Sequence, residues 1–407
     1  MPLEAILAAW FAVALGSELW LSSRQIRYLR DHAEQPVRDR GTRRVVLAAV
    51  ATGLDAALAT WAILGGGIAM LAGAWRTHRF GAGATVATVV FAVAMIDAAM
   101  RLLRTRVIDR RLDGICLPWR QVIARAAAPL IPRTALGIAA GEAGAALIVF
   151  LPGSWWIWAA LLWTIGLAAR SALQPDRRNG GGRAAAARPP DPRLMTQMAP
   201  ALTRLGLAPD RVLVIASPPN TRRANARLAG FGRSLHVELT DTLLMLLTPD
   251  EVEAVLAHEI GHWRCRHVGR DLLYRAVLAA AGFAALALSM RHPAAFAAML
   301  GPHPAPAAWL AAAVALMPMT APVAAPARTF WRRGMEYEAD DFAASHASAR
   351  ALIGALAKLD RVNQTADGAD RLYALFHNAH PPRAERIRRL ASHASAPARD
   401  HGRRCAG

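Results

Sequence analysis

The sequence predicts a mainly α-helical, multi-pass membrane protein with a smaller α+β part outside the bilayer. Of its 407 residues, 54% are hydrophobic and only 19% are charged, and the apolar residues gather in long stretches. Soluble proteins of this size are usually less apolar and more charged. The basic residues collect in some of the segments between these stretches, as they do in the loops of membrane proteins.

Seven apolar stretches reach or approach the ~20 residues that a spanning helix needs. The first has no basic segment ahead of it and contains Glu4 and Glu18, so we predict a retained helix rather than a cleaved signal peptide. The fifth is short and runs into Arg170. The predicted spans are 3–22, 45–74, 82–103, 134–151, 154–173, 271–290 and 304–326.

Arginine content alternates from loop to loop, which predicts the topology. Segments 23–44 and 104–133 carry seven arginines each, whereas 75–81 carries two and 291–303 carries one. The positive-inside rule then puts the N-terminus outside and the C-terminus inside. It also puts the two large polar segments, 174–270 and 327–407, on the cytoplasmic face. We interpret the alanine-rich and arginine-rich composition as bacterial, which would make this the inner membrane.

The predicted domain organisation interleaves membrane helices with the part outside the bilayer. A stretch rich in Gly, Pro and Arg is typical of a flexible linker. The last residues are small, polar and basic, and we predict that they are disordered. The predicted segments are membrane helices 1–173, linker 174–193, extramembrane part 194–270, membrane helices 271–326, extramembrane part 327–390 and tail 391–407.

The extramembrane part contains both strand and helix patterns. Residues 211–217 are apolar and β-branched, and 235–239 alternate between apolar and polar, as a half-buried strand does. Residues 249–268 have helical character, and Thr248 with a Glu three positions later predicts a capping box. Residues 334–361 also favour a helix. We therefore expect an α+β arrangement with a small hairpin or sheet.

The sequence His258-Glu259-Ile260-Gly261-His262 carries the strongest chemical signal. Positions four apart lie on one face of a helix, so His258 and His262 could offer two imidazoles to one zinc ion. Glu259 beside them could accept a proton from a zinc-bound water. The alternative is two ordinary histidines on a helix surface or in a core, since the motif also arises by chance.

Catalytic zinc sites need a third protein ligand and one open position. Glu336 and Asp340 are four residues apart on the second predicted helix, so one could bind zinc while the other orients a ligand. Glu338 points elsewhere on the same helix. The alternative is a solvated acidic helix face, which is common.

These motifs resemble a known family. HEIGHW followed by EYEAD is similar to the integral-membrane zinc metallopeptidases that include HtpX and the CAAX prenyl endopeptidases (peptidase family forty-eight). Seven spans fit the CAAX branch better than HtpX, which has fewer. Similarity is dense over 220–390, and the further similar stretches are Ser22–Ile26, Asn225–Gly232, Asp241–Leu244, Thr248–Val252, His380–Pro382 and Arg386–Ile387.

The resemblance implies a zincin-type α+β catalytic domain with one Zn²⁺ per chain. His258, His262 and Glu336 would bind the zinc, and Glu259 would be the general base. Asp340 would orient a ligand. One departure from the family pattern is Arg332, which stands where the family commonly has Ser.

Two further residues take their roles from the resemblance. Arg386 would keep the site together by pairing with acidic groups. His380 would stabilise the oxyanion, a task for which a His or Tyr donor is one usual means. The alternative for His380 is a loop histidine beside two prolines with no chemical role.

The second predicted strand has a possible substrate-binding role. An edge strand near the zinc can keep a peptide substrate extended through added backbone hydrogen bonds. The alternative is an ordinary hairpin strand. The candidate residues are Leu235, His236, Val237, Glu238 and Leu239.

Acidic residues inside predicted spans suggest either a hydrated interior or a transport pathway, because such groups usually face water or act in function. We favour the hydrated interior, since inverted repeats and broken helices typical of transporters are not evident. The residues are Asp55, Asp97 and Glu142.

The predicted function is zinc-dependent peptide hydrolysis in membrane-protein quality control or CAAX-type processing. The predicted partners are a polypeptide substrate, itself a membrane or membrane-associated protein, and the lipid bilayer. A net charge of +19 could indicate nucleic acid, but no recognisable nucleic-acid module is present and arginine-rich cytoplasmic loops explain it. The alternatives are a non-catalytic membrane scaffold and a transporter using the intramembrane acids.

Overall fold

The computed structural model of the chain divides into two compact units, each built from segments that are separate in the sequence. The membrane unit comprises Met1–Thr164, Arg275–Pro326 and Asp370–Phe376. The sheet unit comprises Ile165–Tyr274, Ala327–Ala369 and His377–Gly407. The structure describes residues 2–77, 81–106, 118–173, 188–217, 224–230, 235–363, 369–378 and 380–395.

Within the described ranges, six helical segments are long and apolar enough to cross a membrane, which confirms the multi-pass fold class. The predicted fifth span forms helix α7 (Trp155–Leu173) but is not among these six, so the count of seven stays a prediction. The six spans are Leu3–His32, Val37–Leu64, Ala82–Arg104, Trp119–Phe150, His267–Ser289 and Pro306–His346.

The predicted span 45–74 is wrong in one respect, because the helix breaks in its middle. Helix α2 (Gln35–Ala59) continues as a π-helical turn over Thr60–Leu64, and a separate helix α3 follows over Gly67–Thr77. Gly66 between them has φ +68°, a conformation that glycine adopts at little cost. Three consecutive glycines therefore end the span at Leu64, although the sequence on both sides is apolar.

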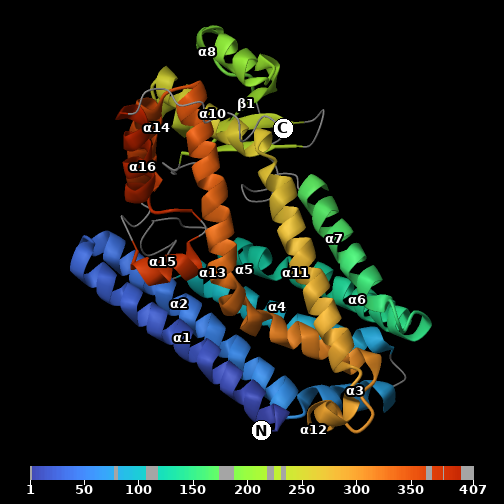
Figure 1. Cartoon of the computed structure of the whole chain (residues 1–407). Helices are drawn as coiled ribbons and strands as arrows, with labels where there is room; N and C mark the ends of the chain where they lie inside the picture. The colour runs from blue at the N-terminus through green and yellow to red at the C-terminus, as the bar shows by residue number, and fades with distance from the viewer. Residues whose placement is uncertain are drawn as a thin grey trace. The chain divides into compact units, whose positions relative to one another are not determined.

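The helices of the membrane unit pack closely where glycines face a neighbour. Helix α1 (Leu3–His32) and α2 form an antiparallel pair, drawn in blue at the lower left of Figure 1. Helix α6 (Leu130–Phe150) packs along α4 (Ala82–Arg104), where a Cβ added at Gly141 would lie 2.8 Å from the Gly83 Cα. Small residues permit such backbone contact in membrane helices.

Two of the three intramembrane acids have protein partners. The Glu142 carboxylate accepts a hydrogen bond of 2.7 Å from the N–H of Gly83, in the first turn of α4 where helical N–H groups lack partners. Asp97 pairs with Arg133 at 2.5 Å. Each of these two carboxylates thus has a polar partner within the protein.

The SSRQI segment of α1 binds a short C-terminal helix, α15 (Arg371–His377). Arg24 donates from Nε and Nη2 to the two carboxylate oxygens of Asp370 at 3.0 and 2.8 Å, and Gln25 accepts from the Asp370 N–H at 2.8 Å. Asp370 in turn accepts from the N–H groups of Leu372 and Tyr373. The hydrogen bond from Arg24 keeps the pKa of Asp370 below its usual range.

The sheet unit contains a three-stranded sheet in the order β1-β3-β2. Strand β1 (Val212–Ile215) runs parallel to β3 (His236–Thr240), and β2 (Ala226–Ala229) runs antiparallel to it. The expectation that Leu235–Leu239 forms an edge strand is therefore wrong, because β3 is central and its backbone is paired on both sides. The two edge strands of the sheet are β1 and β2.

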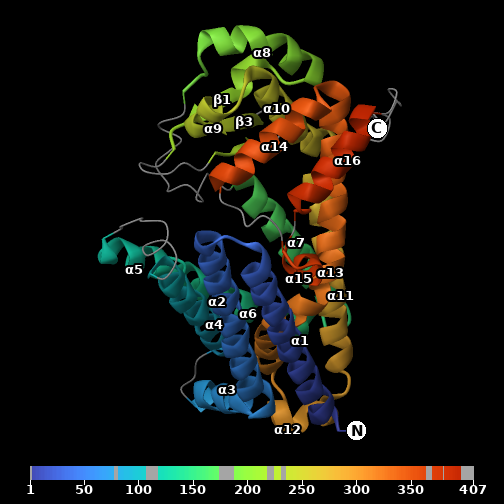
Figure 2. The same ribbon diagram turned by 90° about the vertical axis from the view of Figure 1, so that its left-hand side faces the viewer.

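Helix α10 (Pro249–Arg264) carries the HEIGH motif and contributes many residues to the core of the sheet unit. The predicted capping box is present: Thr248 Oγ1 accepts from the Glu251 N–H at 3.4 Å, and Glu251 accepts from the Thr248 N–H at 2.8 Å. Figure 2 shows the surrounding elements. They include α8 (Pro192–Leu205), α9 (Asp241–Leu246), α14 (Ala349–Asn363) and α16 (Arg383–Ser395).

The end of the predicted linker is structured. Arg188 forms a backbone bridge with Val214, and Asp191 caps α8 by accepting from the Arg193 N–H at 2.8 Å. Residues 174–187 of the linker and 396–407 of the tail lie outside the described residues. Helix α16 extends to Ser395, so the first residues of the predicted disordered tail are helical.

Gly141→Ala should destabilise the protein, because its new Cβ would press on the backbone of α4. Overpacking of this kind costs about 1–3 kcal/mol. Gly16→Ala in α1 is the matched control, since a Cβ there meets open space. Thermal unfolding in detergent should show a lower melting temperature for the first variant only, and equal melting of both would contradict the close packing.

Candidate metal centre

The metal site begins with two histidines on α10. His258 and His262 lie one helical turn apart, with ring centroids 4.8 Å from each other. Gly261 between them lets helix α13 (Pro306–His346) approach, since an added Cβ would lie 3.1 Å from the Phe342 Cβ and 3.3 Å from the Ala339 Cα. The motif therefore supplies the imidazoles and also the space for the helix that brings the third donor.

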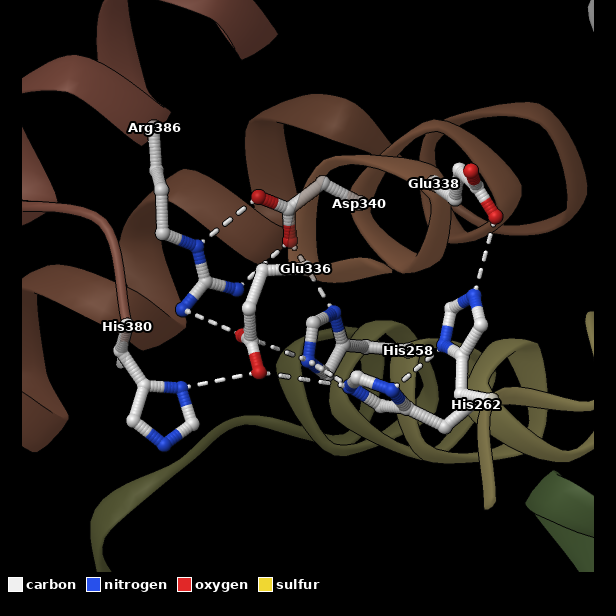
Figure 3. Close-up of polar contacts among 8 residues, drawn as sticks. His258, His262, Glu336, Glu338, Asp340, His380 and Arg386 are labelled. Atoms are coloured by element: carbon white, nitrogen blue, oxygen red, sulfur yellow. Dashed lines mark hydrogen bonds and ion pairs between the residues drawn. The ribbon is translucent and has the colours of Figure 1, made fainter. Parts of the chain in front are cut away.

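Glu336 on α13 completes a three-donor set, as Figure 3 shows. The Nε2 atoms of His258 and His262 are 3.2 Å apart, and they lie 3.8 and 3.7 Å from the two Glu336 oxygens. Donors about 2.0–2.2 Å from a tetrahedral zinc would be about 3.3–3.6 Å from one another. The nitrogen and carboxylate donors and their spacing thus fit zinc.

A buried ion pair orients His258. Its Nδ1 lies 3.0 Å from Asp340, whose side chain is fully buried. Arg386 on α16 binds both Asp340 oxygens, through Nε at 2.8 Å and Nη2 at 2.6 Å, and its Nη1 lies 3.7 Å from Glu336. A carboxylate on Nδ1 fixes the ring and leaves Nε2 free for a metal.

His380 contacts the proposed ligand Glu336. Its Nδ1 lies 2.9 Å from Glu336 Oε1, and its side chain is largely exposed. This hydrogen bond raises the pKa of His380 above its ordinary value. His380 is thus beside the donor set, while its predicted oxyanion role stays a prediction.

Glu259, between the two histidines in the motif, contacts strand β2 of the sheet. It accepts a hydrogen bond from the backbone N–H of Leu228 in β2. Burial raises the pKa of Glu259, and the nearby Glu336 carboxylate raises it further. For His262, burial and the adjacent His258 lower the pKa to about 3, so this imidazole is neutral and can act as a donor to a metal.

Sequence comparison identifies the family. Residues 190–394, half of the chain, match the model of peptidase family M48. The chain belongs to peptidase family M48. Every donor and orienting residue described above lies inside the matched region.

Several curated proteins are similar in sequence to part of this chain. The chain is 29% identical over 182 residues to the CAAX prenyl protease 1 homolog of Arabidopsis thaliana, which covers 44% of this chain and 43% of the relative. It is 34% identical over 104 residues to the HtpX protease homolog of Archaeoglobus fulgidus, covering 25% and 30%. The matches therefore span less than half the length of these relatives.

A solved structure extends the likeness over nearly the whole fold. The S. mikatae Ste24p structure superimposes with a TM-score of 0.76, covering 96% of this chain and 99% of that one at 18% identity. This similarity shows a shared fold. Together with the family match, it confirms the resemblance predicted from the sequence motifs and the predicted fold class.

Sequence reasoning missed a second chain of contacts in this M48 site. Glu338 was expected to point elsewhere and His267 was assigned no role, yet His267 Nδ1 lies 2.8 Å from His262 Nδ1 and His267 Nε2 lies 3.1 Å from Glu338. The available signal was a histidine five residues after the motif. Arg332, the departure from the family pattern, binds Asp271 at 3.3 Å.

The substrate-binding prediction for Leu235–Leu239 requires correction. Strand β3 has neighbours on both sides, so its backbone cannot add a further strand. The edge strand that contacts the site is β2, where the Leu228 backbone is hydrogen-bonded to Glu259. The sequence pattern of β2 gave no strand signal of its own.

Arg386→Met should strongly destabilise the sheet unit, because it leaves the buried Asp340 carboxylate without its counter-charge. Breaking one side of a buried pair costs about 3–5 kcal/mol. Arg389→Met is the matched control, since Arg389 makes a similar bidentate pair with Asp341 at the surface and should cost about 1 kcal/mol or less. The free energies of unfolding measure the difference, and equal losses would contradict the role assigned to burial.

Proposed function

We propose that this protein is a membrane-embedded, zinc-dependent endopeptidase with one Zn²⁺ per chain. The observation that carries the proposal is the convergence of His258, His262 and Glu336 donor atoms within 3.2–3.8 Å, with Glu259 beside them. Membership of a peptidase family supports it. A non-catalytic scaffold would be expected to have lost part of this set, and all of it is present.

A zinc ion in this site would polarise a water molecule and the scissile carbonyl. Glu259 is the proposed general base, accepting the water's proton and passing it to the leaving amine. The backbone N–H of Leu228 orients its carboxylate. His380, exposed and hydrogen-bonded to Glu336, is the proposed donor to the oxyanion.

The substrate backbone is proposed to lie along β2. In the described part of the chain, β1 is covered at Val214 by Arg188, whereas the outer side of β2 has no paired strand. An extended peptide could add to this edge in line with Glu259. The edge strand that we expected at 235–239 is thus replaced by Ala226–Ala229.

The proposed location is the bacterial inner membrane with the site on the cytoplasmic face, as the arginine distribution favours. The proposed substrates are membrane or membrane-associated proteins. Curated relatives are CAAX prenyl proteases and an HtpX protease, which suggests CAAX-type processing or quality control. In a bacterium, prenylated substrates are less expected, so we favour quality control.

Chelation should abolish cleavage of an unfolded membrane-protein substrate, and added zinc should restore it. Glu259→Gln should lower the cleavage rate at least about 100-fold, because general acid–base catalysis contributes about 10²–10⁴-fold. The zinc content of this variant should equal that of the wild type.

Glu253→Gln on the same helix is the matched control. Glu253 pairs with the exposed Arg204 and does not belong to the donor set, so its rate should be unchanged. Cleavage that resists chelation, or that survives Glu259→Gln, would refute the mechanism.

Backbone N-methylation of a cleaved peptide should test the β2 edge. Each methyl group removes one donor and blocks one strand hydrogen bond, so cleavage should fall when alternate residues near the scissile bond are methylated. The ratio kcat/KM of each peptide is the measurement. Equal tolerance at every position would show that the substrate does not add as a strand.

A further inference from the structure

The second histidine of the motif has its own support, separate from the Asp340–Arg386 pair. His262 Nδ1 lies 2.8 Å from His267 Nδ1, and His267 Nε2 lies 3.1 Å from Glu338. Arg270 binds both oxygens of Glu338, with Nη2 at 3.2 Å from Oε1. The contacts form one line from the donor set to α11 (His267–Ser289).

The proton positions follow from the chemistry of the donors. A metal needs the lone pair of His262 Nε2, so the proton of a neutral ring is on Nδ1. His262 Nδ1–H then donates to His267 Nδ1, and His267 Nε2–H donates to the Glu338 carboxylate. Each contact has one donor and one acceptor, and Arg270 compensates the charge of Glu338.

The backbone between His262 and His267 contains a residue in a left-handed conformation, which brings the two rings into contact. Arg266 has φ +54° and is the one non-glycine residue with positive φ among the described ranges. A left-handed residue of this type costs about 1–2 kcal/mol. The turn ends α10 at Arg264 and begins α11 at His267, which places the buried His267 ring 4.9 Å from that of His262.

Glu338 is fixed independently of the metal. Arg270 lies over the Trp331 ring at 5.3 Å, and Trp331 stacks on Tyr274 at 6.0 Å. The carboxylate that ends the line is therefore positioned by packing between α11 and α13. This arrangement satisfies what an orienting group needs, a defined position before the metal binds.

We infer that His267 and Glu338 are positioning residues that fix the tautomer and orientation of His262 for zinc. This inference rests on the proposed function. It assigns the two zinc-binding histidines different supports. His258 contacts a carboxylate directly, whereas His262 contacts one through a second imidazole.

The test is the zinc dissociation constant, measured by competition with a chelating indicator. His267→Phe keeps the ring volume but removes the acceptor, and it should weaken zinc binding about 10–100-fold. His267→Asn should restore most of the affinity, because its Oδ1 can accept from His262. Glu253→Gln on the surface of α10 should bind as the wild type does.

Glu338→Gln is the second variant and leaves every side chain that contacts the metal unchanged. It should weaken zinc binding by about tenfold, the lower end of the range for such partners. A cooperative thermal unfolding transition of the metal-free protein shows that a variant folds. If His267→Phe does not fold, the zinc affinity of Glu338→Gln decides whether the inference stands.

Wild-type affinity in the folded variants would overturn the inference while leaving the proposed function intact. Failure of the wild type itself to bind zinc would instead refute the proposed function. The two failures are therefore distinguishable in one experiment.

Discussion

The close approach of α10 and α13 is the constraint on which the site depends. Gly261 has no side chain at the crossing, and Ala339 and Phe342 lie where its Cβ would be. Only at this separation can a carboxylate one helix away come within 3.8 Å of the imidazoles on α10. The glycine inside the motif is therefore as necessary to the geometry as the donors on either side of it.

Local spacing made much of this site predictable. Two histidines four apart on a capped helix must share a face, and the same holds for Glu336 and Asp340. The structure brings these four side chains together. Spacing could not predict their convergence, since Glu336 lies 74 residues after His262 in the sequence. The resemblance to a family supplied that step.

Other features depended on tertiary pairing and were missed. Strand β2 is only four residues long, ARLA, and has no alternating pattern, so β3 was given the edge position that β2 occupies. The contact of His267 with Glu338 joins residues 71 apart and requires the left-handed Arg266. The three glycines at 65–67 indicated the break at Gly66, but the span 45–74 was predicted as continuous because the sequence on both sides is apolar.

The charges around the site explain why a divalent cation fits it. Glu259, Glu336 and Asp340 carry three negative charges when ionised, and Arg386 compensates one of them. Two negative charges remain in a buried cluster, and burial together with Glu336 raises the pKa of Glu259. A dication bound between the imidazoles and Glu336 would balance that excess and favour the ionised form of Glu259. The form of Glu259 that could accept a proton in the proposed mechanism is thus the form that a bound metal would stabilise.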